Sequence, residues 1–160
     1  MVEPDIRNIV VAGAGLMGAI IAQSFPQYDV HTTLYSNCEA DFERARQIVA
    51  NCHRTLIENG VLTEEKSREI QEALVYTVDT ECFRDAQLVI EAIPEDIQIK
   101  KDFYEMICQI VPEDCIIASN TSAISINELA KFVDKPERFC GTHYLNPAHI
   151  IPVSYTHLTL

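Results

Sequence analysis

The chain has 160 residues, of which 48% are hydrophobic, so it is long enough to bury a core and of a size typical of one domain. Acidic residues outnumber basic ones by 24 to 12, which gives a net charge of -12 and leaves no Lys/Arg cluster for a phosphate backbone. We therefore expect neither nucleic acid nor an anionic membrane as a partner. The sequence shows no positively charged leader and no apolar run of membrane-spanning length, which predicts a cytoplasmic protein.

The cysteines are scattered along the sequence, with no C-x-x-C pair and no histidine at metal-ligand spacing. They are Cys38, Cys52, Cys82, Cys108, Cys115 and Cys140. This distribution predicts reduced thiols that fill the core, and no metal site.

The chain begins with a β-rich segment that leads directly into a glycine-rich turn. Residues 6–12 predict the first strand, and Gly13-Ala14-Gly15-Leu16-Met17-Gly18 then forms a G-x-G-x-x-G motif. In such a motif the first glycine permits the turn and the second lets the backbone approach a pyrophosphate. The third lets the next helix pack close to the sheet. That helix, expected over residues 15–25, would direct its N-terminal amides at the phosphates, so the motif predicts a dinucleotide site.

Short β-rich segments then alternate with helical ones, a pattern typical of a parallel sheet covered by helices. We expect further strands over residues 30–35, 74–78, 88–93, 115–119 and 138–145. Apolar residues recur every three or four positions over residues 39–59, which predicts a long helix, and Thr63 would cap a second one. This helical pair would project as an arm from an α/β, doubly wound Rossmann-type sheet. Further helices are expected after Pro94 and over residues 125–132.

Polar side chains follow three of these strands. Ser36 and Asn37 follow the second strand, residues 119–122 follow the fifth, and His143 and Asn146 follow the sixth. Because ligands of open parallel sheets bind at the carboxyl ends of the strands, we expect the three clusters to meet there. Taken singly, Ser/Asn/Thr runs after strands usually serve turn and capping chemistry, and His143 is also compatible with a half-buried structural ring.

Two ordered motifs identify a family. The segment Ser119-Asn120-Thr121-Ser122, followed by Gly141-Thr142-His143-Tyr144-Leu145-Asn146-Pro147, resembles the L-3-hydroxyacyl-CoA dehydrogenases, which include the 3-hydroxybutyryl-CoA dehydrogenases. The resemblance extends over residues 8–153 and includes the glycine motif and Glu91-Ala92-Ile93-Pro94-Glu95. It implies an oxidoreductase of fatty acid or butanoate metabolism. Such an enzyme transfers a hydride between a (S)-3-hydroxyacyl-CoA, here expected to be short-chain, and a nicotinamide cofactor.

The resemblance also implies roles for single residues. His143 would be the general base that takes the proton of the 3-hydroxyl group, which suits a side chain that titrates near neutrality. Ser122 would hydrogen-bond the same substrate oxygen. The implied cofactor-binding residues are Gly13, Ala14, Gly15, Leu16, Met17, Gly18, Ser36, Ala92, Glu95, Lys100, Ser122 and Asn146. The arm near residues 52–59 would contact coenzyme A, and it offers His53 and Arg54 as cations.

Two positions depart from the family pattern. Ser36 stands where the family has the Asp that receives both ribose hydroxyls of NAD, so NADP stays open beside NAD. The nearest cations are Arg44 and Arg46 on the following helix. Tyr155 stands where a Glu would orient the catalytic histidine, and a phenol carries no charge at neutral pH.

The carboxyl end resembles translated adapter sequence. We expect a dinucleotide-binding domain over residues 1–153 and a non-native tail over residues 154–160, with the family's C-terminal helical domain absent. The intact protein would then be a homodimer through that domain, and this fragment would be poorly active.

Two other functions stay open at this point. A catalytically silent NAD(P)-binding module is favoured by the missing Asp and Glu, and opposed by the retained Ser122 and His143. A related hydroxy-acid dehydrogenase with a substrate other than a coenzyme A ester would keep the same domain but differ in the arm.

Overall fold

The computed structural model of the chain describes residues 5–144 and 154–156. These residues form a seven-stranded sheet in the order β3-β2-β1-β4-β5-β6-β7. The strands are β1 (Asn8–Ala12), β2 (His31–Tyr35), β3 (Leu74–Thr77), β4 (Leu88–Glu91), β5 (Ile116–Ser119), β6 (Phe139–His143) and β7 (Ser154–Thr156). All neighbouring strands pair in parallel except β6 and β7, which are antiparallel. The predicted mostly parallel sheet is confirmed.

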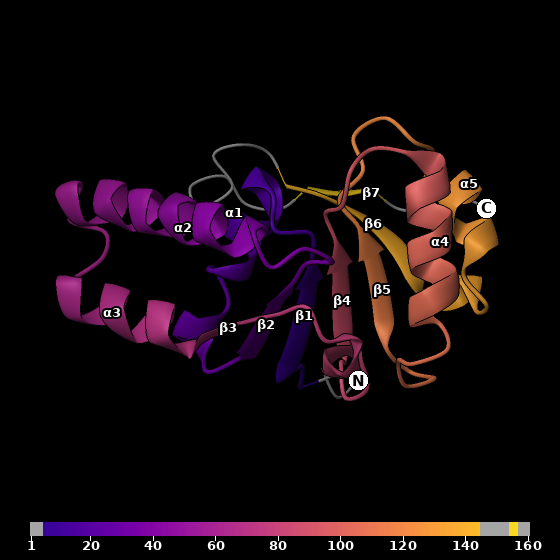
Figure 1. The fold of residues 1–160 in the computed structure, drawn as a ribbon, viewed down its shortest axis with the longest axis horizontal. Coiled ribbons are helices and arrows are strands. Elements are labelled where there is room, and N and C mark those ends of the chain that lie inside the picture. The colour runs from indigo at the N-terminus through magenta and orange to yellow at the C-terminus, as the bar shows by residue number, and fades with distance from the viewer. Residues whose placement is uncertain (1–4, 145–153, 157–160) are drawn as a thin grey trace.

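Helices cover both faces of this sheet (Figure 1). They are α1 (Leu16–Ala22), α2 (Asp41–Glu58), α3 (Glu64–Ala73), α4 (Ile97–Ile107) and α5 (Ile126–Leu129). Alternate residues of β1 face opposite layers, because successive side chains of a strand point to opposite faces. Ile9 and Val11 belong to the core layer beneath α1 and α2, whereas Val10 and Ala12 belong to the layer beneath α4. The doubly wound arrangement is therefore confirmed.

The predicted arm is formed by α2 and α3, which lie side by side beyond β3 (Figure 1). Thr63 caps α3 as expected, because its side-chain oxygen accepts a hydrogen bond from the Lys66 N–H at 3.2 Å. His53 of α2 is 1% exposed, with Nε2 at 2.8 Å from Gln23 Oε1 and Nδ1 at 2.9 Å from Ser67 Oγ. The expectation that His53 offers a surface cation is therefore wrong, since its ring ties α1, α2 and α3 together.

Several local expectations were less accurate than the topology. Helix α4 begins at Ile97, later than Pro94 suggests, because the Asp96 carboxylate accepts hydrogen bonds from the N–H groups of Gln98 and Ile99. Strand β7 was not expected from the sequence. All six cysteines are unpaired, as predicted, but Cys38 is exposed and fills no core. The predicted boundary at Val153 lies outside the described residues and stays a prediction.

No helix within the described part of the chain is long and apolar enough to cross a membrane.

The glycine turn between β1 and α1 is shaped by two close backbone approaches. Gly13 has φ 108°, and a Cβ there would lie 2.4 Å from the carbonyl oxygen of Ala92. A Cβ on Gly18 would lie 1.7 Å from the carbonyl oxygen of Gly13, whereas a Cβ on Gly15 would meet no atom within 4 Å. The first and third glycines of the motif are therefore required by the fold itself, and the second leaves open space for a ligand.

We expect Gly18→Ala to destabilise the folded chain and Gly15→Ala to leave it unchanged. The alanine methyl at position 18 would have to displace backbone, which typically costs about 1–3 kcal/mol and lowers the melting temperature of a chain this size by roughly 2–10 °C. Gly15 already has an extended conformation (φ -73°) that alanine adopts freely. Thermal unfolding followed by circular dichroism measures both variants. Equal melting temperatures for the two would contradict the geometry of the turn.

Candidate functional site

A cavity of about 790 Å³ lies at the carboxyl ends of β1, β2 and β4, a volume within the range of ligand pockets. Its lining comes from the glycine turn, the ends of β2 and β4, and helices α2 and α4. The lining residues are Gly13, Ala14, Gly15, Leu16, Met17, Tyr35, Ser36, Asn37, Asp41, Arg44, Ala92, Ile93, Pro94, Ile99, Asp102, Phe103 and Met106. The lining thus combines backbone of the glycine turn with side chains of α4, most of which are apolar.

Most of the residues predicted to bind a cofactor gather at this cavity. Gly18 is an exception, since it lies behind the turn against Gly13 and Ala92. Glu95, Lys100 and Ser122 are absent from the lining and form a second cluster with His143. Asn146 lies outside the described residues.

The end of the cavity at β2 carries the serine that departs from the family pattern. Ser36 is 4% exposed, and its hydroxyl donates a hydrogen bond of 2.7 Å to Oδ2 of Asp41. Arg44 lines the cavity, whereas the guanidinium of Arg46 lies 4.4 Å from the ring centroid of Tyr76, above the edge strand β3. Of the two cations noted in the sequence, only Arg44 faces the cavity.

The second cluster joins the loop after β5 to the end of β6. Ser122 Oγ lies 3.2 Å from His143 Nε2. The side-chain oxygen of Asn120 accepts a hydrogen bond of 2.8 Å from the backbone N–H of Tyr144, so the loop is linked both to the histidine and to the residue that follows it. The predicted meeting of these two polar clusters is confirmed.

The third cluster, at Ser36, does not join them. Strand β2 stands three places from β5 in the sheet, a separation of roughly 14 Å at the usual strand spacing. Ser36 and Ser122 therefore lie well apart along the carboxyl ends of the strands. One extended ligand could contact both residues, whereas a small ligand could not.

Glu95 holds the serine loop in place. Its Oε1 accepts hydrogen bonds from the Thr121 hydroxyl and from the backbone N–H groups of Ser122 at 3.1 Å and Ala123 at 3.0 Å. Burial alone would raise the pKa of Glu95, but Thr121, the Ala123 N–H and the Lys100 ammonium together outweigh it and hold the pKa at about 2. The carboxylate is consequently charged at neutral pH and anchors the turn that presents Ser122.

Beneath Glu95 lies a buried charge network that the sequence did not reveal. Lys100 is 1% exposed and reaches both Glu91 at 2.6 Å and Glu95 at 3.1 Å. Glu91 is 0% exposed at the end of β4, and its Oε2 accepts hydrogen bonds from the hydroxyls of Tyr104 and Ser119. Burial and the neighbouring Glu91 raise the pKa of Tyr104, which keeps its hydroxyl a donor. The signal available in the sequence was an ionisable residue at the end of an otherwise apolar strand.

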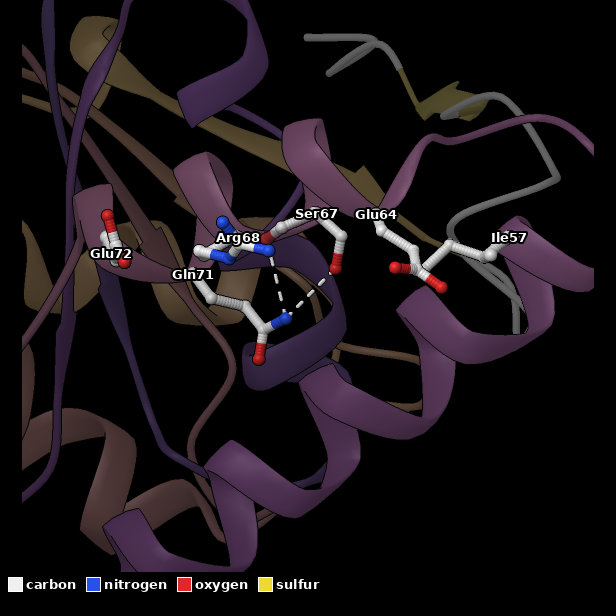
Figure 2. Close-up of a pocket in the computed structure, with 6 residues that line it drawn as sticks. All are labelled: Ile57, Glu64, Ser67, Arg68, Gln71 and Glu72. Carbon is white, nitrogen blue, oxygen red and sulfur yellow. Dashed lines mark hydrogen bonds between the residues drawn. The ribbon is translucent and has the colours of Figure 1, made fainter.

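A second, shallower cavity lies on the arm and is shown in Figure 2. It is lined by Ile57, Glu64, Ser67, Arg68, Gln71 and Glu72. Gln71 Nε2 donates hydrogen bonds to the carbonyl oxygen and the hydroxyl of Ser67, so the floor of this cavity is continuous with the buried His53 network. Arg68, and not His53, is the cation that the arm presents there.

We expect Lys100→Met to destabilise the chain far more than the neighbouring Lys101→Met. Removing one partner of a buried ion pair leaves an uncompensated charge and costs about 3–5 kcal/mol, whereas Lys101 is 40% exposed and its contact with Glu105 at 3.8 Å is worth less than about 1 kcal/mol. Urea unfolding compares the two. The double variant Glu91→Gln with Lys100→Met should recover part of the lost free energy of unfolding. A destabilisation by Lys100→Met no larger than that by Lys101→Met would show that the buried network does not stabilise the fold.

Glu95 should make stability depend on acidic pH. Because its pKa is lowered to about 2 in the folded chain from an ordinary 4.5, its contribution is complete above pH 4.5 and disappears as the pH falls towards 2. Glu95→Gln should therefore be less stable than the parent chain at pH 6, with a difference that narrows steadily down to pH 2. Urea unfolding of both proteins across this range measures the difference, and a gap independent of pH would contradict the assignment.

Comparisons with known proteins agree with this geometry. Residues 8–154 match the family "3-hydroxyacyl-CoA dehydrogenase, NAD binding domain". The chain is 31% identical over 148 residues to a peroxisomal fatty acid beta-oxidation multifunctional protein of Oryza sativa subsp. japonica, covering 92% of this chain and 20% of the relative.

Two solved structures show the same fold. A (S)-3-hydroxybutyryl-CoA dehydrogenase, PaaH1 from Ralstonia eutropha, is 32% identical with a TM-score of 0.85, and the match covers 90% of this chain and 51% of that one. A 5-formyl-3-hydroxy-2-methylpyridine 4-carboxylic acid 5-dehydrogenase, described as an NAD⁺-dependent dismutase, is 35% identical with a TM-score of 0.80, and the match covers 92% of this chain and 47% of that one. The chain thus spans about a fifth of the curated relative and about half of the solved ones. With its glycine turn, its cavity and its family match over residues 8–154, this chain belongs to the NAD-binding domain family of the 3-hydroxyacyl-CoA dehydrogenases.

Proposed function

We propose that this chain is the cofactor-binding and proton-transferring part of a dehydrogenase that interconverts short-chain (S)-3-hydroxyacyl-CoA, such as 3-hydroxybutyryl-CoA, and 3-ketoacyl-CoA. The observation that carries the proposal is the contact of 3.2 Å between Ser122 Oγ and His143 Nε2, on the same sheet edge as the glycine-turn cavity. NAD, the cofactor of this family, supplies the hydride acceptor when it is bound.

The residues of the cavity fit such a cofactor. Gly15 leaves the space above the turn open, where a pyrophosphate would approach the backbone and the N-terminus of α1. The apolar side chains of Ile99, Phe103 and Met106 offer a wall for a flat ring. Asn146 and Lys100 remain proposed cofactor contacts.

His143 and Ser122 would divide the work on the substrate oxygen. In the oxidation, Nε2 of His143 takes the proton of the 3-hydroxyl group while the C3–O bond becomes a carbonyl, and in the reduction it returns that proton. Ser122 donates a hydrogen bond to the same oxygen. Glu95 is a positioning residue for this pair, because it holds the backbone N–H groups of Ser122 and Ala123.

The arm would contribute to the binding of coenzyme A. Its cavity contains Arg68, whose guanidinium suits a phosphate, although Glu64 and Glu72 flank it. The whole protein's partners belong to the same proposal: an acyl-CoA substrate, and assembly as a homodimer outside this domain. A cytoplasmic location stays a prediction, and the rice relative is named as peroxisomal.

A substrate without coenzyme A is the second candidate. It is favoured by the relative at 35% identity, whose name gives a pyridine carboxylic acid as its substrate. This alternative keeps the roles of His143 and Ser122 and removes the need for the arm.

For the intact protein, we expect NADH-dependent reduction of acetoacetyl-CoA that falls by about 10²–10⁴-fold in kcat in His143→Ala, with the Kd for NADH changed less than about twofold. Absorbance of NADH measures turnover. His31→Ala is the matched control, because His31 is exposed at the opposite, amino-terminal end of β2 and should leave turnover unchanged.

The outcomes separate the candidate functions. Normal turnover in His143→Ala would remove His143 from the role of base. Reduction of a hydroxy-acid's keto form but not of acetoacetyl-CoA would favour the second candidate. NADH binding by the intact protein without turnover of either substrate would favour a silent binding module.

A further inference from the structure

The serine at the end of β2 does not face the cavity alone. The Ser36 hydroxyl donates a hydrogen bond of 2.7 Å to Asp41 Oδ2, and its oxygen accepts one of 3.3 Å from the Cys38 N–H. Ser36 is 4% exposed, whereas Asp41 is exposed at the start of α2 and lines the cavity. A carboxylate supplied from the following helix is therefore held at this end of the cavity.

A carboxylate at this place favours one cofactor over the other. The adenine-side ribose of NAD presents two hydroxyl donors, which a carboxylate accepts well. NADP carries a phosphate on the 2′ oxygen, which a neighbouring carboxylate repels. The family's usual Asp stands on the strand end itself, and here Ser36 occupies that place while holding Asp41 five residues later.

Arg44 opposes this preference, since it lines the same cavity one helical turn beyond Asp41. Within the described residues no hydrogen bond or ion pair fixes the Arg44 guanidinium, whereas Asp41 is held by a short hydrogen bond to a buried hydroxyl. A fixed charge acts on a ligand without first losing side-chain entropy, so the carboxylate has the advantage. Arg46 packs over the ring of Tyr76 and does not contribute to the charge at this end of the cavity.

We propose that Asp41, positioned by Ser36, is the residue that selects NAD over NADP in this chain. The inference rests on the dinucleotide site of the proposed function, but not on the substrate or on His143. Asp41 thus replaces in space the carboxylate that the sequence lacks at position 36.

The test measures the binding of NADH and NADPH separately, by the fluorescence of the reduced nicotinamide, to the 160-residue chain and its variants. The parent chain should bind NADH more tightly. Asp41→Asn keeps the size and the Ser36 contact but removes the charge, and should lower the ratio Kd(NADPH)/Kd(NADH) by about tenfold or more. Ser36→Ala should lower it in part, because the carboxylate is then present but not held.

Glu43→Gln is the matched control. It removes the same charge from the same first turn of α2, and Glu43 bonds Gln47 outside the cavity, so the ratio should stay within about twofold. Circular dichroism checks that each variant is folded. An unchanged ratio in Asp41→Asn, or a parent chain that prefers NADPH, would overturn the inference and leave the proposed function standing. A folded parent chain that binds neither dinucleotide would overturn both.

Discussion

The buried ion pair between Lys100 and Glu91 connects the sheet to the candidate catalytic loop. Lys100 comes from α4, Glu91 from the end of β4, and the same ammonium reaches Glu95, whose carboxylate holds the backbone of Ser122. Charges this deeply buried are tolerated only when they are paired and hydrogen-bonded, and here Tyr104 and Ser119 complete the shell around Glu91. The position of Ser122 relative to His143 is thus a consequence of electrostatics beneath the surface.

The geometry of the glycine turn, where the cofactor would bind, is determined by backbone sterics and not by charge. Gly13 and Gly18 are needed because neighbouring carbonyl oxygens occupy the space of a Cβ, which brings α1 close to the sheet. A methyl group on Gly15 would meet no atom within 4 Å, and Gly15 lines the cavity. Two constraints of different origin therefore shape the two halves of one site: a steric one at the glycine turn after β1, and an electrostatic one at the serine loop after β5, two strands away.

The order of strands and helices was accessible from the sequence because each element carries its own periodicity, and the glycine turn follows a β-rich run in the expected place. Helix ends and β7 were less accessible, since caps such as Asp96 and the pairing of β7 with β6 depend on particular local bonds. His53 was expected to be a cation of the arm because it lies in the segment that the family resemblance links to coenzyme A, yet the structure buries its ring against Gln23 and Ser67. The sequence marks Glu91 only as part of the family resemblance, because its buried partners Lys100, Tyr104 and Ser119 meet it only when α4 and β5 pack against β4.

The sequence by itself determined the fold class, the dinucleotide turn and the pairing of Ser122 with His143, because these features follow from local patterns and ordered motifs. Only the tertiary structure decided what surrounds them. It paired Lys100 with Glu91, made Glu95 the anchor of the serine loop, and brought Asp41 to Ser36 at 2.7 Å. Such contacts depend on which side chains meet when strands and helices pack together. The absence of a carboxylate at position 36 therefore revealed nothing about whether one reaches the same place from α2.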